Sequence, residues 1–297
     1  MYKIIDKQIL TENTDLMVIE APNIARKARP GQFIIFRKDE YSERIPLTIA
    51  DYDAEKGTIT IIFQKVGMST HELAAMETGE MVRNVVGPLG KASEIKLYGE
   101  VVLVAGGVGI APVFPIARAL HEAGNRVTLI LGARSETLLF WEEKMASVCD
   151  ELIICTDDGS KGQKALVTQP LREILQSRPQ IAMVWAIGPA IMMKFCCETA
   201  RPFNTPILVS LNSVMVDGTG MCGACRVEVG GETRFVCVDG PEFDGLLVNW
   251  DVVLARKKIF VNEEKQAMTA WMHEHEDQHV CNLDKALLKQ EISREAI

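Results

Sequence analysis

The sequence predicts a β-barrel followed by a doubly wound α/β domain and a small cysteine-rich lobe. The chain has 297 residues, which is enough for two domains that each have a core. Short strand-like runs fill the first hundred residues, apolar runs alternate with helical patterns after residue 98, and glycine and cysteine become frequent after residue 210. These changes divide the chain into residues 1–97, 98–210 and 211–261, followed by a polar, helix-prone tail at 262–297.

The first segment, residues 1–97, has the pattern of a small antiparallel barrel. Its runs of β-branched and aliphatic residues are short and are separated by Gly, Pro, Asn and Asp, as in strands joined by turns. One helical pattern, Ser69–Met76, interrupts them. The predicted strands are Tyr2–Leu10, Leu16–Glu20, Gln32–Arg37, Leu47–Asp51 and Thr58–Lys65.

The second segment, residues 98–210, alternates continuous apolar runs with amphipathic helical patterns. This alternation is typical of a parallel sheet that helices cover on both faces. The run Pro206–Ser210 closes the segment as one last buried strand. The predicted strand and helix pairs are Val101–Ala105 with Val113–Ala123, Arg126–Gly132 with Glu136–Val148, Glu151–Thr156 with Val167–Gln176, and Ile181–Ile187 with Ala190–Thr199.

Charge and cysteine content exclude several classes of protein. Lys and Arg number 32 against 40 Asp and Glu, and the net charge of −8 has the wrong sign for a nucleic-acid or anionic-membrane partner. The eight cysteines are unevenly spaced, and the chain opens on a strand-like run rather than on an export signal. We therefore expect a cytoplasmic protein with no nucleic-acid or membrane partner, whose cysteines act as ligands rather than as disulfides.

The strongest local signal lies in the glycine-rich lobe. Asp217, Cys222, Cys225 and Cys237 stand at positions x, x+5, x+8 and x+20. Thiolates at C-x-x-C spacing bind iron or zinc, and glycines let the backbone fold closely around a metal centre. The lobe has too few large side chains for a core, so a bound metal would order it. The spacing favours a [2Fe-2S] cluster; a structural zinc site and merely buried cysteines are the alternatives.

A second signal follows the first strand of the α/β segment. Gly106, Gly107 and Gly109, followed by Pro112, separate a buried strand from a helical pattern. A dinucleotide pyrophosphate can approach the backbone and the helix N-terminus at such a turn. The pattern departs from G-x-G-x-x-G, so tight packing of the turn is the alternative.

The barrel segment contains a third signal. Arg44 precedes the strand residue Thr48, and Gly67, Ser69 and Thr70 open the helical pattern of the barrel. An arginine beside a strand and a helix N-terminus can together hold a diphosphate. A surface arginine and an ordinary helix cap are the alternative.

The order of these motifs resembles the ferredoxin-NADP reductase superfamily, and the likeness covers nearly the whole chain. Within the superfamily, the chain is similar to two families of iron-sulfur flavoprotein subunits, those of dihydroorotate dehydrogenase B and the small subunits of NADH-dependent ferredoxin:NADP oxidoreductases. The segments that carry this likeness are 87–90, 132–135, 156–160, 188–189 and 237–243.

The resemblance implies FAD, NAD(H) and a [2Fe-2S] cluster, with hydride passing directly between the rings and no catalytic side chain. The implied FAD contacts are Arg44, Pro46, Leu47, Thr48, Gly67, Ser69 and Thr70. The implied NAD(H) contacts are Gly106, Gly107, Gly109, Pro112, Arg134, Asp157, Gly188 and Pro189. The implied cluster ligands are Asp217, Cys222, Cys225 and Cys237.

Three departures refine this likeness. Arg44 lies four residues before Thr48, whereas the superfamily motif is Arg-x-x-Ser/Thr. Asp217 stands where the dihydroorotate dehydrogenase B subunits have cysteine, and the chain continues well past the cluster lobe. The last two features resemble the ferredoxin:NADP oxidoreductase small subunits.

That second family implies a heterodimer with a larger flavoprotein that carries another FAD and [4Fe-4S] clusters, reaches ferredoxin, and couples its reactions by electron bifurcation. The alternatives are an electron-transfer subunit of dihydroorotate dehydrogenase B and a zinc-stabilised nucleotide-binding module without redox chemistry. The tail, with Trp271, Leu283, Leu287 and Leu288, either docks a partner or packs onto its own chain.

Overall fold

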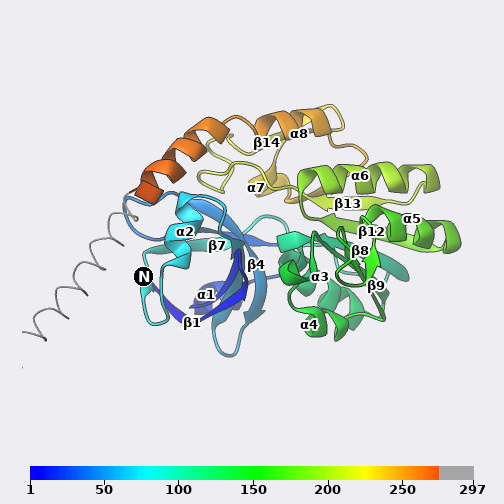
Figure 1. Ribbon diagram of the computed structural model, residues 1–297, viewed down its shortest axis with the longest axis horizontal. Helices are drawn as coiled ribbons and strands as arrows, with labels where there is room; N and C mark the ends of the chain where they lie inside the picture. The colour runs from blue at the N-terminus through cyan, green and yellow to red at the C-terminus, as the bar shows by residue number, and fades with distance from the viewer. Residues whose placement is uncertain (274–297) are drawn as a thin grey trace, which may run out of the picture.

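The computed structural model describes residues 1–273 and has the predicted architecture. Figure 1 shows the barrel beside the α/β domain, with the cysteine-bearing lobe above both in this view. Two seven-stranded sheets and one separate two-stranded hairpin make up the described β-structure. A cavity lies where these parts meet.

The barrel is one nearly closed antiparallel sheet with the strand order β6-β1-β2-β5-β4-β3-β7. Alternate residues of β3 serve two cores, because Ile34 and Phe36 face the barrel interior while Phe33 and Ile35 pack toward the lobe. The barrel and the lobe are therefore in direct contact along β3. The elements are β1 (Tyr2–Thr11), β2 (Thr14–Glu20), α1 (Pro22–Ala25), β3 (Phe33–Arg37), β4 (Ile45–Asp53), β5 (Thr58–Gln64), α2 (Met68–Ala74), β6 (Met81–Val82) and β7 (Asn84–Leu89).

The α/β domain is a doubly wound sheet with the order β11-β10-β9-β8-β12-β13-β16. Its strands run parallel except β16, which comes from the lobe and pairs antiparallel with β13. The order reverses direction between β8 and β12, so the switch point lies there. The elements are β8 (Glu100–Gly106), η1 (Gly107–Gly109), α3 (Ile110–Glu122), β9 (Arg126–Ala133), η2 (Glu136–Leu138), α4 (Glu142–Ala146), β10 (Glu151–Thr156), β11 (Gln163–Lys164), α5 (Thr168–Ser177), β12 (Ile181–Ile187), α6 (Ala190–Ala200), η3 (Arg201–Phe203), β13 (Ile207–Ser210) and β16 (Glu242–Asp244).

The lobe is small and has little regular structure. Its elements are β14 (Arg226–Val229), β15 (Glu232–Phe235), α7 (Val236–Asp239) and α8 (Trp250–Arg256). Residues 261–273 form a further helix, which in Figure 1 extends from the region of α8 toward α2 of the barrel.

The predicted helix Glu136–Val148 is wrong as a single element. Only η2 and the short α4 form within it, and Trp141 between them has a left-handed backbone with a φ of 59°. Leu139 and Phe140 are buried, and the Trp141 ring packs edge-on against Phe114 at a centroid distance of 5.4 Å. Successive apolar side chains cannot all face one core from a helix, so tertiary packing overrides the helical pattern here.

Candidate redox site

A cavity of about 300 Å³ opens where the barrel, the α/β domain and the lobe meet. It lies beyond the carboxyl ends of β8, β12 and β13, which is where doubly wound sheets bind ligands. Its walls are mostly apolar with a few hydroxyl and amide groups, a composition that suits a flat aromatic ring system. The predicted site residues that line it are Pro46, Leu47, Thr48, Thr70, Gly109, Pro112 and Gly188.

Sequence reasoning missed other lining residues. Ser210 ends β13 and Asn212 lies just beyond it, and the rule that ligands bind beyond the carboxyl ends of parallel strands could have found them. Phe33, Met215 and Pro241 also line the cavity, but long-range contacts bring them there and no local pattern marks them.

The glycine turns on the α/β side are in backbone contact with each other. A Cβ atom added to Gly109 would lie 2.1 Å from the carbonyl oxygen of Ile187, and one added to Gly188 would lie 2.9 Å from the carbonyl oxygen of Gly106. The turn after β8 therefore crosses the turn after β12 at a distance that only glycine permits. This packing forms the cavity wall, so the packing and ligand-binding interpretations of the glycines are compatible.

The remaining residues of these two turns flank the crossing. Gly107 has a φ of 54°, which favours glycine, and Pro189 is the N-cap of α6. Both lie next to residues that line the cavity.

On the barrel side, Thr70 organises the start of α2. Its Oγ1 accepts hydrogen bonds from the N–H groups of Val66 (3.0 Å) and Gly67 (3.1 Å) and donates to the carbonyl of Gly67 (2.9 Å). The hydroxyl of Ser69 donates to Glu43 Oε2 at 2.5 Å, so a pyrophosphate at this helix would have to displace the carboxylate of Glu43. Arg44 is exposed immediately before β4.

Arg134 and Asp157 lie after β9 and β10, at the same edge of the sheet as the cavity. The two loops are joined, since the N–H groups of Asp157 and Asp158 donate to the carbonyls of Ala133 and Arg134, both at 3.1 Å. The hydroxyl of Ser160 donates to Asp158 Oδ1 at 2.6 Å and holds the pKa of that carboxyl below its usual value. Arg134 itself is exposed.

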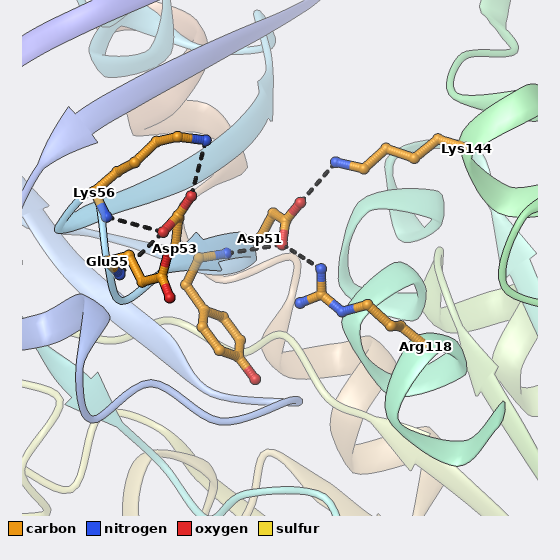
Figure 2. Close-up of polar contacts among 7 residues, drawn as sticks. Asp51, Asp53, Glu55, Lys56, Arg118 and Lys144 are labelled. Atoms are coloured by element: carbon orange, nitrogen blue, oxygen red, sulfur yellow. Dashed lines mark hydrogen bonds and ion pairs between the residues drawn. The ribbon is translucent and has the colours of Figure 1, made fainter. Parts of the chain in front are cut away.

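An ion cluster joins the barrel to the α/β domain and fixes two walls of the cavity relative to each other (Figure 2). Asp51, near the end of β4, binds Arg118 of α3 at 2.8 Å and Lys144 of α4 at 2.7 Å. The Lys144 ammonium also lies 3.9 Å from the centroid of the Trp141 ring. Because β4 and α3 both begin at the cavity, this contact at their far ends sets their relative position.

We expect Asp51→Asn to lower the free energy of unfolding by about 2 kcal/mol, between the values for exposed and buried ion pairs. The variant leaves Arg118 and Lys144 facing each other without the carboxylate that separates their charges. Urea unfolding measures the change. Asp53→Asn is the matched control, because Asp53 lies on the same strand and its ion pair with Lys56 is more exposed, so its change should stay within about 0.5 kcal/mol. Equal effects of the two variants would mean that the ion cluster of Asp51, Arg118 and Lys144 does not clamp the barrel to the α/β domain.

In the lobe, the four predicted ligands lie in two pairs. The Sγ atoms of Cys225 and Cys237 are 3.2 Å apart and buried. Asp217 accepts hydrogen bonds from the N–H groups of Thr219 (2.7 Å) and Cys222 (2.8 Å), and Cys222 is exposed. Within residues 1–273, no three His, Cys, Asp or Glu side chains converge as a single metal ion would need. A [2Fe-2S] cluster takes two ligands on each iron, and the adjacent thiols of Cys225 and Cys237 fit one such pair.

The protonation of these groups follows from their surroundings. The N–H of Thr219, and then that of Cys222, hold the pKa of Asp217 below its usual value, so this carboxyl is an anionic oxygen donor at neutral pH. Burial, and then the contact with Cys225, raise the pKa of the Cys237 thiol to about 12. Metal binding must therefore displace a proton from Cys237.

Three glycines shape the loop that carries these ligands. Gly218, Gly220 and Gly223 all have φ between 69° and 86°, a backbone region that favours glycine. A Cβ on Gly218 would lie 2.7 Å from Ile35 and 2.8 Å from Leu89, so the loop rests directly on β3 and β7 of the barrel. Because Phe33 of β3 lines the cavity, the cysteine loop and the cavity share one strand.

The described part of the tail packs on its own chain. The Trp271 ring lies 5.1 Å from the ring of His71 on α2. Leu283, Leu287 and Leu288 lie outside the described residues. Among residues 1–273, helices long and apolar enough to cross a membrane are absent.

Comparison with known proteins agrees with this geometry. Residues 212–249 match the iron-sulfur cluster binding domain of dihydroorotate dehydrogenase B, and residues 103–198 match an oxidoreductase NAD-binding domain. The first match covers all four predicted ligands, and it replaces the zinc alternative with an iron-sulfur centre.

Relatives extend the match to most of the chain. A Thermotoga maritima protein named as a homolog of the dihydroorotate dehydrogenase B electron transfer subunit is 48% identical over 89% of this chain and 93% of its own length. The electron transfer subunit of Desulforamulus reducens is 33% identical over 84% of this chain and all of its own length.

A solved structure of the NADH-dependent reduced ferredoxin-NADP oxidoreductase, studied for flavin-based electron bifurcation, contains a similar chain. It superposes with a TM-score of 0.87 at 46% identity over 92% of this chain and 98% of that one. The chain therefore belongs to the family of electron transfer subunits represented by dihydroorotate dehydrogenase B, with a ferredoxin-NADP reductase-like fold, an NAD-binding domain and an iron-sulfur-binding domain.

Proposed function

We propose that this chain is the small subunit of an electron-bifurcating NADH-dependent ferredoxin:NADP oxidoreductase. FAD in the cavity would exchange a hydride with NAD(H), and a [2Fe-2S] cluster would carry single electrons between that flavin and a larger partner. The observation that carries the proposal is the shared strand β3, which borders the cavity through Phe33 and supports the cysteine loop through Ile35. Because Phe33 and Ile35 lie on the same face of β3, the two cofactors would be neighbours along one strand.

The chain's own contribution to hydride transfer is positioning. Pro46, Leu47 and Thr48 of β4 line the barrel side of the cavity, where the flavin ring would bind, and the crossed glycine turns line the α/β side, where a nicotinamide would bind. Such positioning would be enough, because direct hydride transfer between a bound nicotinamide and a flavin would need no acid or base from the protein. The Asp51 clamp keeps the two walls at a fixed separation.

NAD(H) is the proposed dinucleotide rather than NADP(H). The ionised carboxyl of Asp158 lies on the loop after β10, with Asp157 beside it, and that loop is bonded to the loop after β9, the strand after which a Rossmann-type domain contacts the adenosine ribose. A carboxylate there can accept a hydrogen bond from a ribose hydroxyl but repels a 2′-phosphate. Arg134 is exposed on the adjacent loop.

For the cluster, the proposed ligands are Asp217 with Cys222 on one iron and Cys225 with Cys237 on the other. The exposed Cys222 marks the outer side of the cluster, and exposed apolar side chains surround the lobe there: Val214, Val216, Met221 and Val238. Such a surface supports docking of the larger subunit, which would carry a second FAD and [4Fe-4S] clusters and would reach ferredoxin.

The test is a visible absorption spectrum of the protein purified without oxygen, with iron, sulfide and zinc measured on the same sample. We expect flavin bands and a broad shoulder that NADH bleaches, with about two irons and two sulfides per chain. A colourless protein that contains zinc would contradict the proposal.

A second candidate function is the electron transfer subunit of dihydroorotate dehydrogenase B, which the names of the relatives favour. The partner that copurifies with the native chain separates the two. A partner rich in iron that reduces ferredoxin supports the bifurcating enzyme, whereas one that oxidises dihydroorotate supports the second candidate.

A further inference from the structure

Side chains hold three successive peptide carbonyls of the cysteine loop. Arg226 donates to the carbonyl of Gly223 at 3.3 Å, Arg256 to that of Ala224 at 2.9 Å, and Ser213 to that of Cys225 at 3.4 Å. The contact of Arg256 is the shortest and reaches across 32 residues of sequence. The carbonyls are thereby bonded to side chains, while the N–H of Ala224 lies 3.5 Å from the Sγ of Cys222.

Arg256 is the last residue of helix α8, and contacts at the first turn of the helix hold the helix in place. The amide of Asn249 caps the helix by accepting from the N–H of Val252 at 3.2 Å, and it donates to Glu228 Oε1 at 3.1 Å. The buried Trp250 donates from Nε1 to the carbonyl of Gly245 at 3.2 Å. Because Glu228 lies on β14, which begins directly after Cys225, helix α8 and the cysteine loop share one support.

The charge of Arg256 opposes that of the site. Three thiolates and the carboxyl of Asp217 would bring four negative charges to the cluster, and reduction adds one more. A guanidinium is always protonated and is half-buried here, where water screens its field less than at an open surface. Its field therefore stabilises the reduced state of a cluster more than the oxidised state.

We propose that Arg256 is a positioning residue that fixes the Ala224 peptide of the cluster loop and raises the reduction potential of the cluster. This inference rests on the proposed function, since it requires the cluster at Asp217, Cys222, Cys225 and Cys237. It assigns to α8, which carries none of these ligands, a role in setting the driving force of electron transfer.

The experiment is a dithionite titration of the purified protein, followed by the electron paramagnetic resonance signal of the reduced cluster. Each cluster takes one electron from dithionite, and no bond in the protein forms or breaks. In Arg256→Gln the equilibrium constant for reduction should fall about tenfold, the size expected for one charge near a partly buried site. For a one-electron couple this is a potential lower by about 59 mV. Arg256→Lys keeps the charge and should stay within about threefold of the wild type.

Lys258→Gln is the matched control, because it removes one positive charge from the exposed turn after α8 and should leave the potential unchanged. Iron and sulfide analysis of the wild-type protein tests the proposed function separately, because a wild-type chain that binds no iron contradicts the proposed function itself. An iron-loaded Arg256→Gln protein with the wild-type potential overturns the inference alone. If Arg256→Gln loses its iron, Arg256→Lys decides, and a tenfold fall in that charge-conserving variant overturns the role of the charge.

Discussion

Substitution of Cys225 by serine is expected to remove at least nine-tenths of the bound iron while FAD remains in the protein. Cys225 is buried, and its Sγ lies 3.2 Å from that of Cys237, so the two thiols form one half of the proposed ligand set. A serine hydroxyl is smaller, keeps its proton near neutral pH and is a poorer ligand for iron than a thiolate. Iron analysis and the flavin absorbance of the same sample measure the two effects independently.

Cys149→Ser is the control for this substitution. Cys149 is a free, half-buried cysteine of the α/β domain, where burial raises the pKa of the thiol to about 11 and keeps it protonated. Its replacement should leave iron content at the wild-type value. A Cys225→Ser protein that keeps its iron would contradict the ligand assignment, and one that loses FAD with its iron would mean that the lobe is needed to form the flavin cavity.

The fold could be predicted from the sequence because its signals are local. The alternation of strand and helix from Val101 onward fixes a parallel sheet without knowledge of any distant contact. The prediction of one helix over Glu136–Val148 is wrong because long-range packing decides the structure there. Leu139 and Phe140 are buried in a core built by other elements and do not continue the helix.

The candidate site could be predicted only in part. Glycines at the ends of strands, such as Gly109 and Gly188, can be recognised because the strand, the turn and the following helix are neighbours in the sequence. The ion pairs of Asp51 reach far along the chain, because Arg118 is 67 positions away from Asp51 and Lys144 is 93 positions away. Nothing near Asp51 in the sequence marks these contacts. The contact of Arg256 with Ala224 is hidden in the same way, because it depends on how α8 packs on β14.

The second large effect is expected for Gly109→Ala, which should lower the free energy of unfolding by about 3 kcal/mol and weaken NADH binding more than tenfold. The backbone of Gly109 has a φ of −60°, which alanine adopts without strain, so its conformation contributes nothing to this cost. The cost comes from contact alone, because the new Cβ would lie 2.1 Å from the carbonyl oxygen of Ile187. One of the two crossed turns must move away, and both turns line the cavity.

Gly67→Ala separates this effect from the general loss of a glycine. An added Cβ at Gly67 would meet nothing within 4 Å, and its φ of −148° is extended, so the free energy of unfolding should change by no more than about 0.5 kcal/mol. Urea unfolding and NADH titration of the Gly109→Ala protein then distinguish the two roles of the turn. Lost stability with unchanged NADH affinity would mean that the glycines serve packing only, and that the dinucleotide binds on another face of the α/β domain. Loss of both means that the close crossing of the two turns is itself what shapes the nicotinamide site.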